Sequence, residues 1–289
     1  MIELPLPPGV ERLVIQTSRR RVQALHGVPR PEVDNGIDVV MVSGFFGTKE
    51  DFREVMSLLA AAGYRGWAYD YCGQLELAAG EVAYSIADMA GDLIELMHTV
   101  TGGRPAHLIG HCLGGFVARS AAVAEPGLAR SLTLVACGPS MQDDKNQSML
   151  EGLAKLHANG GTIALWPLVK ALLAKDDTVM HEFWHTKLSE MNPSWVTGTA
   201  ESMADEPDRS AELVAAGIPS LVVFGKRDRR VWSHDTYAEM ADRLQAGSVI
   251  IPKASHSPNM EQPGLLAEAV LEFWAPEDAH ENEPVAVAG

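Results

Sequence analysis

Three residues of types that can carry out acyl-group chemistry stand far apart in the chain: Cys112, Asp228 and His256. Cys112 lies in Gly-His-Cys-Leu-Gly, directly after an apolar run and directly before a long apolar-periodic stretch. This pattern predicts a strand, a sharp turn and a helix, with the cysteine at the tip of the turn. A turn this tight strains its middle residue and leaves room only for glycine on either side. The thiol at the tip is therefore a candidate nucleophile.

A cysteine nucleophile needs a base to take its proton, an acid to orient the base, and N–H donors for the oxyanion. His256, between the last predicted strand and the last predicted helix, is the candidate base. Asp228, in a Gly-x-x-Asp turn after a predicted strand, is the candidate orienting carboxylate. We expect the oxyanion donors to be the N–H of Leu113 and an N–H of the glycine-bearing loop 43–47, that of Phe45.

The stretches between these motifs alternate between two patterns. Continuous apolar runs at 37–42, 131–136 and 218–224 are typical of strands buried on both faces. Helical periodicity, as at 83–99, separates them. Strands alternating with helices predict an α/β fold with a mostly parallel, doubly wound sheet. The candidate triad then lies at the carboxyl edge of that sheet.

The alternation stops near residue 138 and resumes near 213. Residues 139–212 show helical patterns without a clear strand, which predicts a helical cap between the core segments 1–138 and 213–275. The acidic stretch 276–289 contains few large apolar groups, so we expect a disordered tail there. The aromatic side chains of the cap are expected to line an apolar acyl pocket: Trp166, Trp184 and Trp195.

Together these motifs resemble the α/β-hydrolase superfamily over residues 20–275, nearly the whole chain. The resemblance rests on the elbow Gly-His-Cys-Leu-Gly-Gly, the Gly-x-x-Asp turn and the segment His-Ser-Pro-Asn-Met-Glu-x-Pro, in the order nucleophile, acid, histidine. The capped layout is most similar to the esterase, lipase and epoxide-hydrolase branch. The resemblance implies the α/β-hydrolase fold. The chain departs from the usual pattern in having Ser43-Gly44 in place of His-Gly, and cysteine in place of serine.

The sulfur nucleophile affects the expected reaction. A thiol at a helix N-terminus beside a histidine exists largely as thiolate, and its attack gives a thioester acyl-enzyme. We expect hydrolysis of an ester, thioester or lactone of a small or medium apolar acyl group, without a cofactor. An acyltransferase that passes the acyl group to an amine, thiol or alcohol is the alternative, because a thioester reacts readily with such acceptors.

Two other classes of function compete with this interpretation. The segment His181-Glu182-Phe183-Trp184-His185 fits H-E-x-x-H, which on a helix places two histidines on one face for zinc. It lies inside the predicted cap, where an amphipathic cap helix is the simpler interpretation. A non-catalytic α/β-hydrolase-like protein is the other alternative, although such proteins usually lack part of the triad, which is complete here.

Composition excludes several partners. The net charge is −15, from 23 basic and 38 acidic residues, so neither nucleic acid nor an anionic membrane surface is an expected partner. Three irregularly spaced cysteines, with no signal peptide and no membrane-length apolar run, predict a soluble cytoplasmic protein. The expected partner is a small-molecule acyl substrate, either free or carried as a thioester on a carrier. The sequence does not indicate an oligomeric state.

Overall fold

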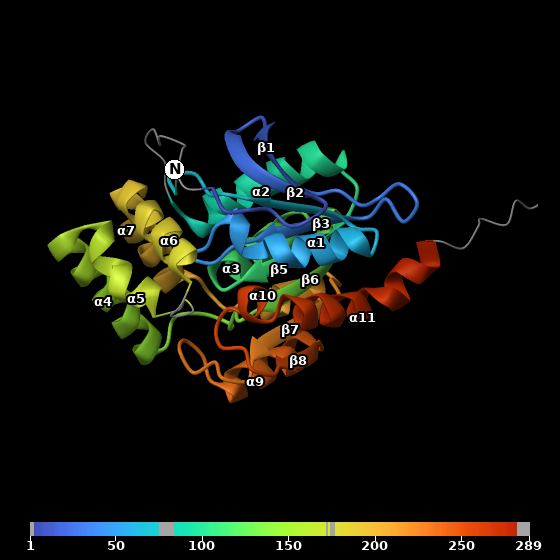
Figure 1. The fold of residues 1–289 in the computed structure, drawn as a ribbon. Helices are drawn as coiled ribbons and strands as arrows, with labels where there is room; N and C mark the ends of the chain where they lie inside the picture. Colours follow the sequence, from blue (N-terminus) through green and yellow to red (C-terminus); the bar gives the residue numbers. More distant parts are fainter. Residues whose placement is uncertain (1–2, 75–83, 172, 174–176, 282–289) are drawn as a thin grey trace, which may run out of the picture.

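An eight-stranded sheet forms the centre of the molecule in a computed structural model, which describes residues 3–74, 84–171, 173 and 177–281 (Figure 1). The strand order is β1-β2-β4-β3-β5-β6-β7-β8. Strands β1, β2 and β4 pair antiparallel and all other neighbours pair parallel. The strands are β1 (Val10–Gln16), β2 (Arg21–Gly27), β3 (Asp38–Val42), β4 (Arg65–Tyr69), β5 (Ala106–His111), β6 (Ala129–Val135), β7 (Ser220–Gly225) and β8 (Gly247–Ile251).

The central strands are buried along most of their length because both faces of the sheet are covered. Side chains alternate between the faces: Val39 and Met41 of β3 belong to one core cluster, and Val40 and Val42 belong to the other. Every residue of β3, β5 and β7 is buried. This sheet confirms the predicted α/β fold with a mostly parallel, doubly wound sheet.

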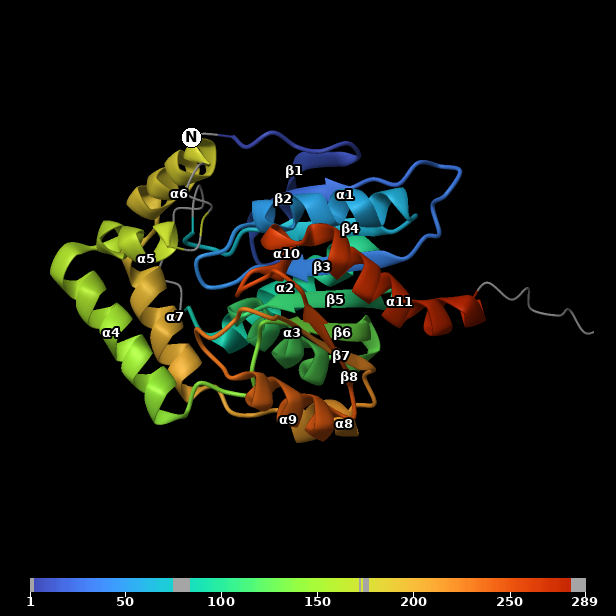
Figure 2. The ribbon, with the colours of Figure 1, turned by 60° about the horizontal axis from the view of Figure 1, so that its bottom comes forward.

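Helices pack on the two faces (Figure 2). The face that includes Met41 is covered by α1 (Arg53–Ala61) and α11 (Pro263–Glu281), and the opposite face by α2 (Ile86–Thr101), α3 (Leu113–Ala124) and α9 (His234–Leu244). Shorter helical turns connect these elements: η1 (Lys49–Phe52), η2 (Pro126–Leu128) and α10 (Pro258–Glu261).

The chain between β6 and β7 is helical and stands largely apart from the sheet. Figure 2 shows four of its helices together on one side of the molecule, and we call these four the cap: α4 (Asp144–Gly160), α5 (Trp166–Lys170), α6 (Thr178–Glu190) and α7 (Pro193–Asp205). A short turn, η3 (Thr162–Leu165), joins α4 to α5. The last helix of this segment, α8 (Ser210–Ala215), lies instead beside α9 and α3 in the core.

The prediction of a disordered C-terminal tail is wrong for residues 276–281. A disordered tail was expected over 276–289, but α11 continues to Glu281, and residues 282–289 lie outside the described part of the chain. The buried carboxylate of Asp278 accepts hydrogen bonds from Tyr64 and Arg130. These bonds attach the end of the helix to the core. Among the described residues, the helices are too short or too polar to cross a membrane.

Candidate active site

The turn between β5 and α3 holds Cys112 in a backbone conformation that few residues other than glycine adopt, with φ 51° and ψ −113°. Its neighbours must be glycines for a steric reason. A Cβ on Gly110 would lie 2.4 Å from the carbonyl oxygen of Gly114, and one on Gly114 would lie 2.1 Å from that of Val42. The backbone N–H of Cys112 donates to the Val135 carbonyl at 2.9 Å. The close fit presents the cysteine at the end of the sheet, where it lines a pocket.

Asp228 and His256 meet at the same end of the sheet. His256 Nδ1 donates to Asp228 Oδ2 at 2.9 Å. The carboxylate is fully buried and also accepts the Tyr237 hydroxyl at 2.9 Å and the Arg230 N–H at 3.1 Å. Burial alone would raise the pKa of Asp228, but the hydrogen bond and charge of His256 and these two donors lower it below the ordinary value. Asp228 is therefore held as a carboxylate facing the imidazole.

The imidazole of His256 interacts with the Asp228 carboxylate and with the Cys112 thiol. Burial opposes its charge, but hydrogen bonds with Asp228 and Cys112 outweigh burial and raise the pKa of His256 to about 10. A positively charged ring at neutral pH is the state that can give up a proton. The structure thus brings together all three side chains of the predicted triad.

Glu261 holds the loop that carries His256, although the sequence did not single it out. Its carboxylate accepts the N–H of Ser255 at 3.0 Å and that of Ser257 at 3.1 Å, on either side of the histidine. His111 supports the same loop, because its Nε2 donates to the His256 carbonyl at 2.7 Å. Burial lowers the pKa of His111 to about 4, so its ring is neutral at neutral pH.

The loop 43–47 lies against the cysteine turn. A Cβ on Gly44 would lie 3.0 Å from His111 Nδ1 and 3.5 Å from the Cβ of Cys112, so glycine allows this approach. Neither of the predicted oxyanion donors, the N–H groups of Phe45 and Leu113, donates to any residue in the described part of the chain. Both N–H groups therefore remain available to a ligand.

A buried lysine of the cap donates hydrogen bonds to the loop 43–47. Lys187 of α6 is 1% exposed, and its Nζ donates to the carbonyls of Phe46 at 3.1 Å and Gly47 at 2.6 Å. Burial lowers the pKa of Lys187 to about 8, although the nearby carboxylates oppose the shift. Burial raises the pKa of its neighbour Asp51 to about 7.

A second buried lysine lies in the same cluster of charges. Lys49 Nζ lies 2.5 Å from Asp70 Oδ2 and 3.0 Å from Glu50 Oε1. All of these charged side chains are buried, and Glu50 and Asp51 also line the pocket.

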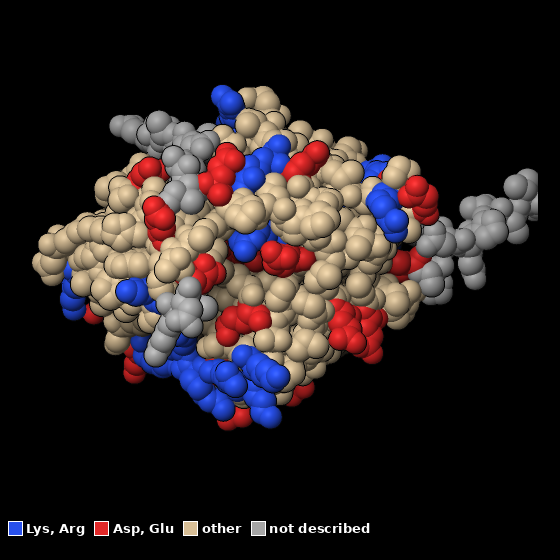
Figure 3. All heavy atoms as spheres, in the orientation of Figure 1, with Lys and Arg blue, Asp and Glu red and all other residues tan. Residues whose placement is uncertain are grey.

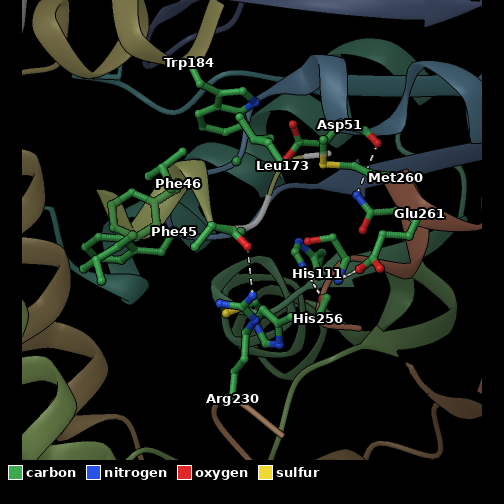
Figure 4. A pocket seen from close by; sticks show the side chains of 18 of the residues that line it. Phe45, Phe46, Asp51, His111, Leu173, Trp184, Arg230, His256, Met260 and Glu261 are labelled. Carbon is green, nitrogen blue, oxygen red and sulfur yellow. Dashed lines mark hydrogen bonds between the residues drawn. The ribbon is translucent and has the colours of Figure 1, made fainter. Parts of the chain in front are cut away.

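The pocket that Cys112 and His256 line has a volume of about 680 Å³. Figure 4 shows the rings of Phe45 and Phe46 on one side of it and those of His111 and His256 across from them. The cap contributes mainly flexible apolar side chains: Met149, Leu150, Leu153, Met180 and Met203. A pocket of this size and lining suits an apolar acyl group.

The predicted aromatic lining is correct for Trp184 and wrong for Trp166 and Trp195. Trp184 alone of the three cap tryptophans lines the pocket, while Trp195 is fully buried against Tyr71 and Tyr84. Trp166 instead packs against the two histidines of the H-E-x-x-H segment, with ring centroids 6.0 Å from His181 and 5.3 Å from His185. A tryptophan in a cap without strands can face the core of the cap as readily as the substrate, and sequence periodicity does not separate these cases.

The H-E-x-x-H segment lies on α6, and the part of the chain that the structure describes supplies no third ligand to it. Within residues 3–74, 84–171, 173 and 177–281, no group of three or more His, Cys, Asp or Glu side chains is arranged to hold a metal ion. The segment forms part of the amphipathic cap helix that also carries Trp184 and Lys187.

Comparison with known proteins agrees with this architecture. A model of the alpha/beta hydrolase family matches residues 39–269. The chain is 28% identical to a putative carbamate hydrolase RutD of Variovorax paradoxus, covering 83% of this chain and 92% of that protein. It is also 28% identical to a pimeloyl-[acyl-carrier protein] methyl ester esterase of Aeromonas hydrophila, covering 82% and 95%. A solved esterase of Thermogutta terrifontis shares the fold, with a TM-score of 0.76 at 22% identity and coverage of 93% and 99%.

Proposed function

This chain belongs to the α/β-hydrolase family, and we propose that it hydrolyses a carboxylic ester or thioester through a covalent intermediate on Cys112. The observation that carries this proposal is the hydrogen bond between His256 and Asp228 in the pocket that Cys112 lines from a strained turn. Of the two relatives described above, one is named a putative carbamate hydrolase and the other a methyl ester esterase, and both names describe hydrolysis at an acyl carbon.

In the first half-reaction the thiolate of Cys112 attacks the acyl carbon, and the carbonyl electrons move onto the oxygen. The N–H groups of Phe45 and Leu113 stabilise the resulting oxyanion. When the tetrahedral intermediate collapses, the bond to the leaving group breaks and the imidazolium of His256 gives its proton to the departing alkoxide or thiolate. Asp228 holds the ring and stabilises its charge.

In the second half-reaction water releases the acyl group. Neutral His256 takes a proton from the water, whose oxygen attacks the thioester carbon of the acyl-enzyme. Collapse of this second tetrahedral intermediate frees the carboxylic acid and restores the thiolate and the imidazolium. The raised pKa of His256, about 10, keeps its ring protonated at the start of the cycle.

Intact-protein mass spectrometry after incubation with p-nitrophenyl butyrate and a butyryl thioester tests the proposal. We expect an increase equal to one acyl group in the wild type and none in the Cys112→Ala variant. The matched control is Cys72→Ala, because Cys72 is a free cysteine outside the pocket lining. An adduct that survives in Cys112→Ala would contradict the assignment. Transfer of the acyl group to an added amine or thiol faster than to water would show that the protein is an acyltransferase.

A further inference from the structure

An exposed cluster of positive charge lies at the mouth of the pocket. Lys226, Arg227, Arg229 and Arg230 occupy four of five consecutive positions, and Lys253 lies on the neighbouring turn. We call these five residues the basic rim. In a chain of net charge −15 such a concentration is unusual. Figure 3 shows Lys and Arg side chains gathered along the lower edge of the molecule, over the turns that precede α9.

The two turns of the rim are joined by backbone hydrogen bonds. The N–H of Lys226 donates to the carbonyl of Ile251 at 2.9 Å, and that of Arg227 donates to the carbonyl of Ala254 at 2.8 Å. Arg230 and Lys253 both line the pocket. Because these turns also carry Asp228 and His256, the positive charge lies beside the entrance to the reacting atoms.

The rim charges are not neutralised by the protein. None of the five side chains forms an ion pair with a residue in the described part of the chain. Asp228, which lies between them in sequence, is buried against His256 and Tyr237. Like charges held this close repel one another, and an anionic ligand relieves that repulsion.

Three acidic residues that line the pocket accept hydrogen bonds or form an ion pair. Glu261 accepts backbone N–H groups on both sides of His256, Glu54 pairs with Arg53 at 3.3 Å, and Asp177 accepts the N–H of Met180 at 3.0 Å. The pocket lining itself therefore carries both signs of charge, and the concentration of positive charge is confined to the exposed rim.

We propose that the basic rim binds the phosphate groups of an acyl thioester of the coenzyme A type, whose acyl end occupies the apolar pocket. This inference rests on the proposed function. Guanidinium and ammonium groups bind phosphate oxygens by charge-assisted hydrogen bonds, and several of them suit a ligand that carries several phosphate charges. The rim would also attract such a ligand against the repulsion of the negative protein.

A comparison of two thioesters that share the same reacting bond tests the proposal. Butyryl coenzyme A carries the phosphates, and butyryl-N-acetylcysteamine lacks them. For the wild type we expect the higher kcat/KM with butyryl coenzyme A, and we expect added salt to lower that value but not the value for the neutral thioester.

The variant Lys226→Gln/Arg227→Gln/Arg229→Gln removes three rim charges that do not line the pocket. We expect it to lower kcat/KM for butyryl coenzyme A roughly 10-fold, or about 1.4 kcal/mol, mainly through KM. Its kcat/KM for the neutral thioester should stay within about 2-fold of the wild type. The matched control, Arg65→Gln/Lys155→Gln/Arg243→Gln, changes the net charge equally but removes ion-paired residues outside the pocket lining. We expect that control to resemble the wild type with both substrates.

The outcomes separate the rim from the proposed chemistry. If the wild type turns over the neutral thioester but does not prefer butyryl coenzyme A, the inference about the rim is wrong while the proposed function stands. An equal loss with both thioesters in the rim variant would also overturn it, because the rim would then only support the turns. Rim-dependent turnover of a butyryl-loaded acyl carrier protein, without turnover of butyryl coenzyme A, would assign the rim to an acidic protein instead. If the wild type forms no acyl-enzyme with any ester or thioester, the proposed function itself fails.

Discussion

The contact between Lys187 and the loop 43–47 predicts that a cap residue distant in sequence controls the rate of the chemical step. The variant Lys187→Met keeps the length of the side chain and removes its charge. It leaves the buried carbonyls of Phe46 and Gly47 without their donor. We therefore expect the loop to lose the conformation in which the Phe45 N–H serves as the proposed oxyanion donor.

The expected effect on stability is small because two contributions oppose each other. Two buried carbonyls without a donor cost about 1–3 kcal/mol each. Removing the buried ammonium relieves a penalty of about 3 kcal/mol, since burial lowers the pKa of Lys187 from 10.5 to about 8. The free energy of unfolding should therefore fall by only roughly 1 kcal/mol.

The expected effect on kcat is larger than the effect on stability, because removing the buried ammonium does not compensate for a displaced oxyanion donor. Loss of one oxyanion donor slows comparable reactions roughly 100- to 1,000-fold. Partial displacement of the loop should therefore lower kcat roughly 10- to 100-fold. An oxyanion donor acts on the transition state, so kcat and kcat/KM should fall together while KM changes little.

Steady-state kinetics with p-nitrophenyl butyrate, together with urea unfolding, would measure both effects. Lys170→Met is the matched control, because Lys170 is an exposed lysine at the end of cap helix α5. A kcat within about 2-fold of the wild type would refute the reasoning, whatever the change in stability. A fall in kcat that only follows the fraction of unfolded protein would refute it as well.

Three further predictions follow from the residues around His256. Asp228→Asn should lower kcat roughly 1,000-fold or more and return the raised pKa of His256 toward its ordinary value, which a pH–rate profile detects. Glu261→Ala should lower kcat roughly 10-fold, because the N–H groups of the loop that carries His256 lose their acceptor. The control Glu268→Ala, on the exposed surface of α11, should change kcat less than 2-fold in the same assay. Burial holds the pKa of His111 at about 4, so the unfolded chain binds a proton between about pH 6.5 and 4 that the folded chain does not. The wild type should lose about 3 kcal/mol of stability as the pH falls through that window, and urea unfolding of His111→Gln should show a smaller loss.

The sequence was enough to predict the fold class and the family and to nominate the residues of the candidate site, because those features follow from local patterns and their order. The strand–turn–helix around Cys112 follows from apolar periodicity and from glycines that no other residue can replace in so tight a turn. Because the carboxyl ends of parallel strands meet at one edge of the sheet, the turns that carry Asp228 and His256 were expected to lie beside it. The order of motifs along the chain was therefore sufficient to nominate all three residues.

Only the tertiary structure identified the residues that support them. In the sequence, Tyr237 is one apolar-face residue of a helix among many. Only the structure shows that its hydroxyl donates to Asp228. Lys187 lies 140 positions from Gly47 in sequence, and its role depends on how the cap sits on the core. The basic rim becomes a single surface only because the turns after β7 and β8 are hydrogen-bonded to each other.

The two errors made from the sequence have the same physical origin. Composition predicted a disordered tail from its acidic residues, but Asp278 is a buried partner of Tyr64 and Arg130, so the helix continues to Glu281. All three cap tryptophans were expected in the pocket, but Trp195 packs against Tyr71 and Tyr84, and the cap lines the cavity mainly with methionines and leucines beside Trp184. Local patterns determine which backbone elements form. The partner of each side chain depends on elements distant in sequence, and only the packed chain brings those together.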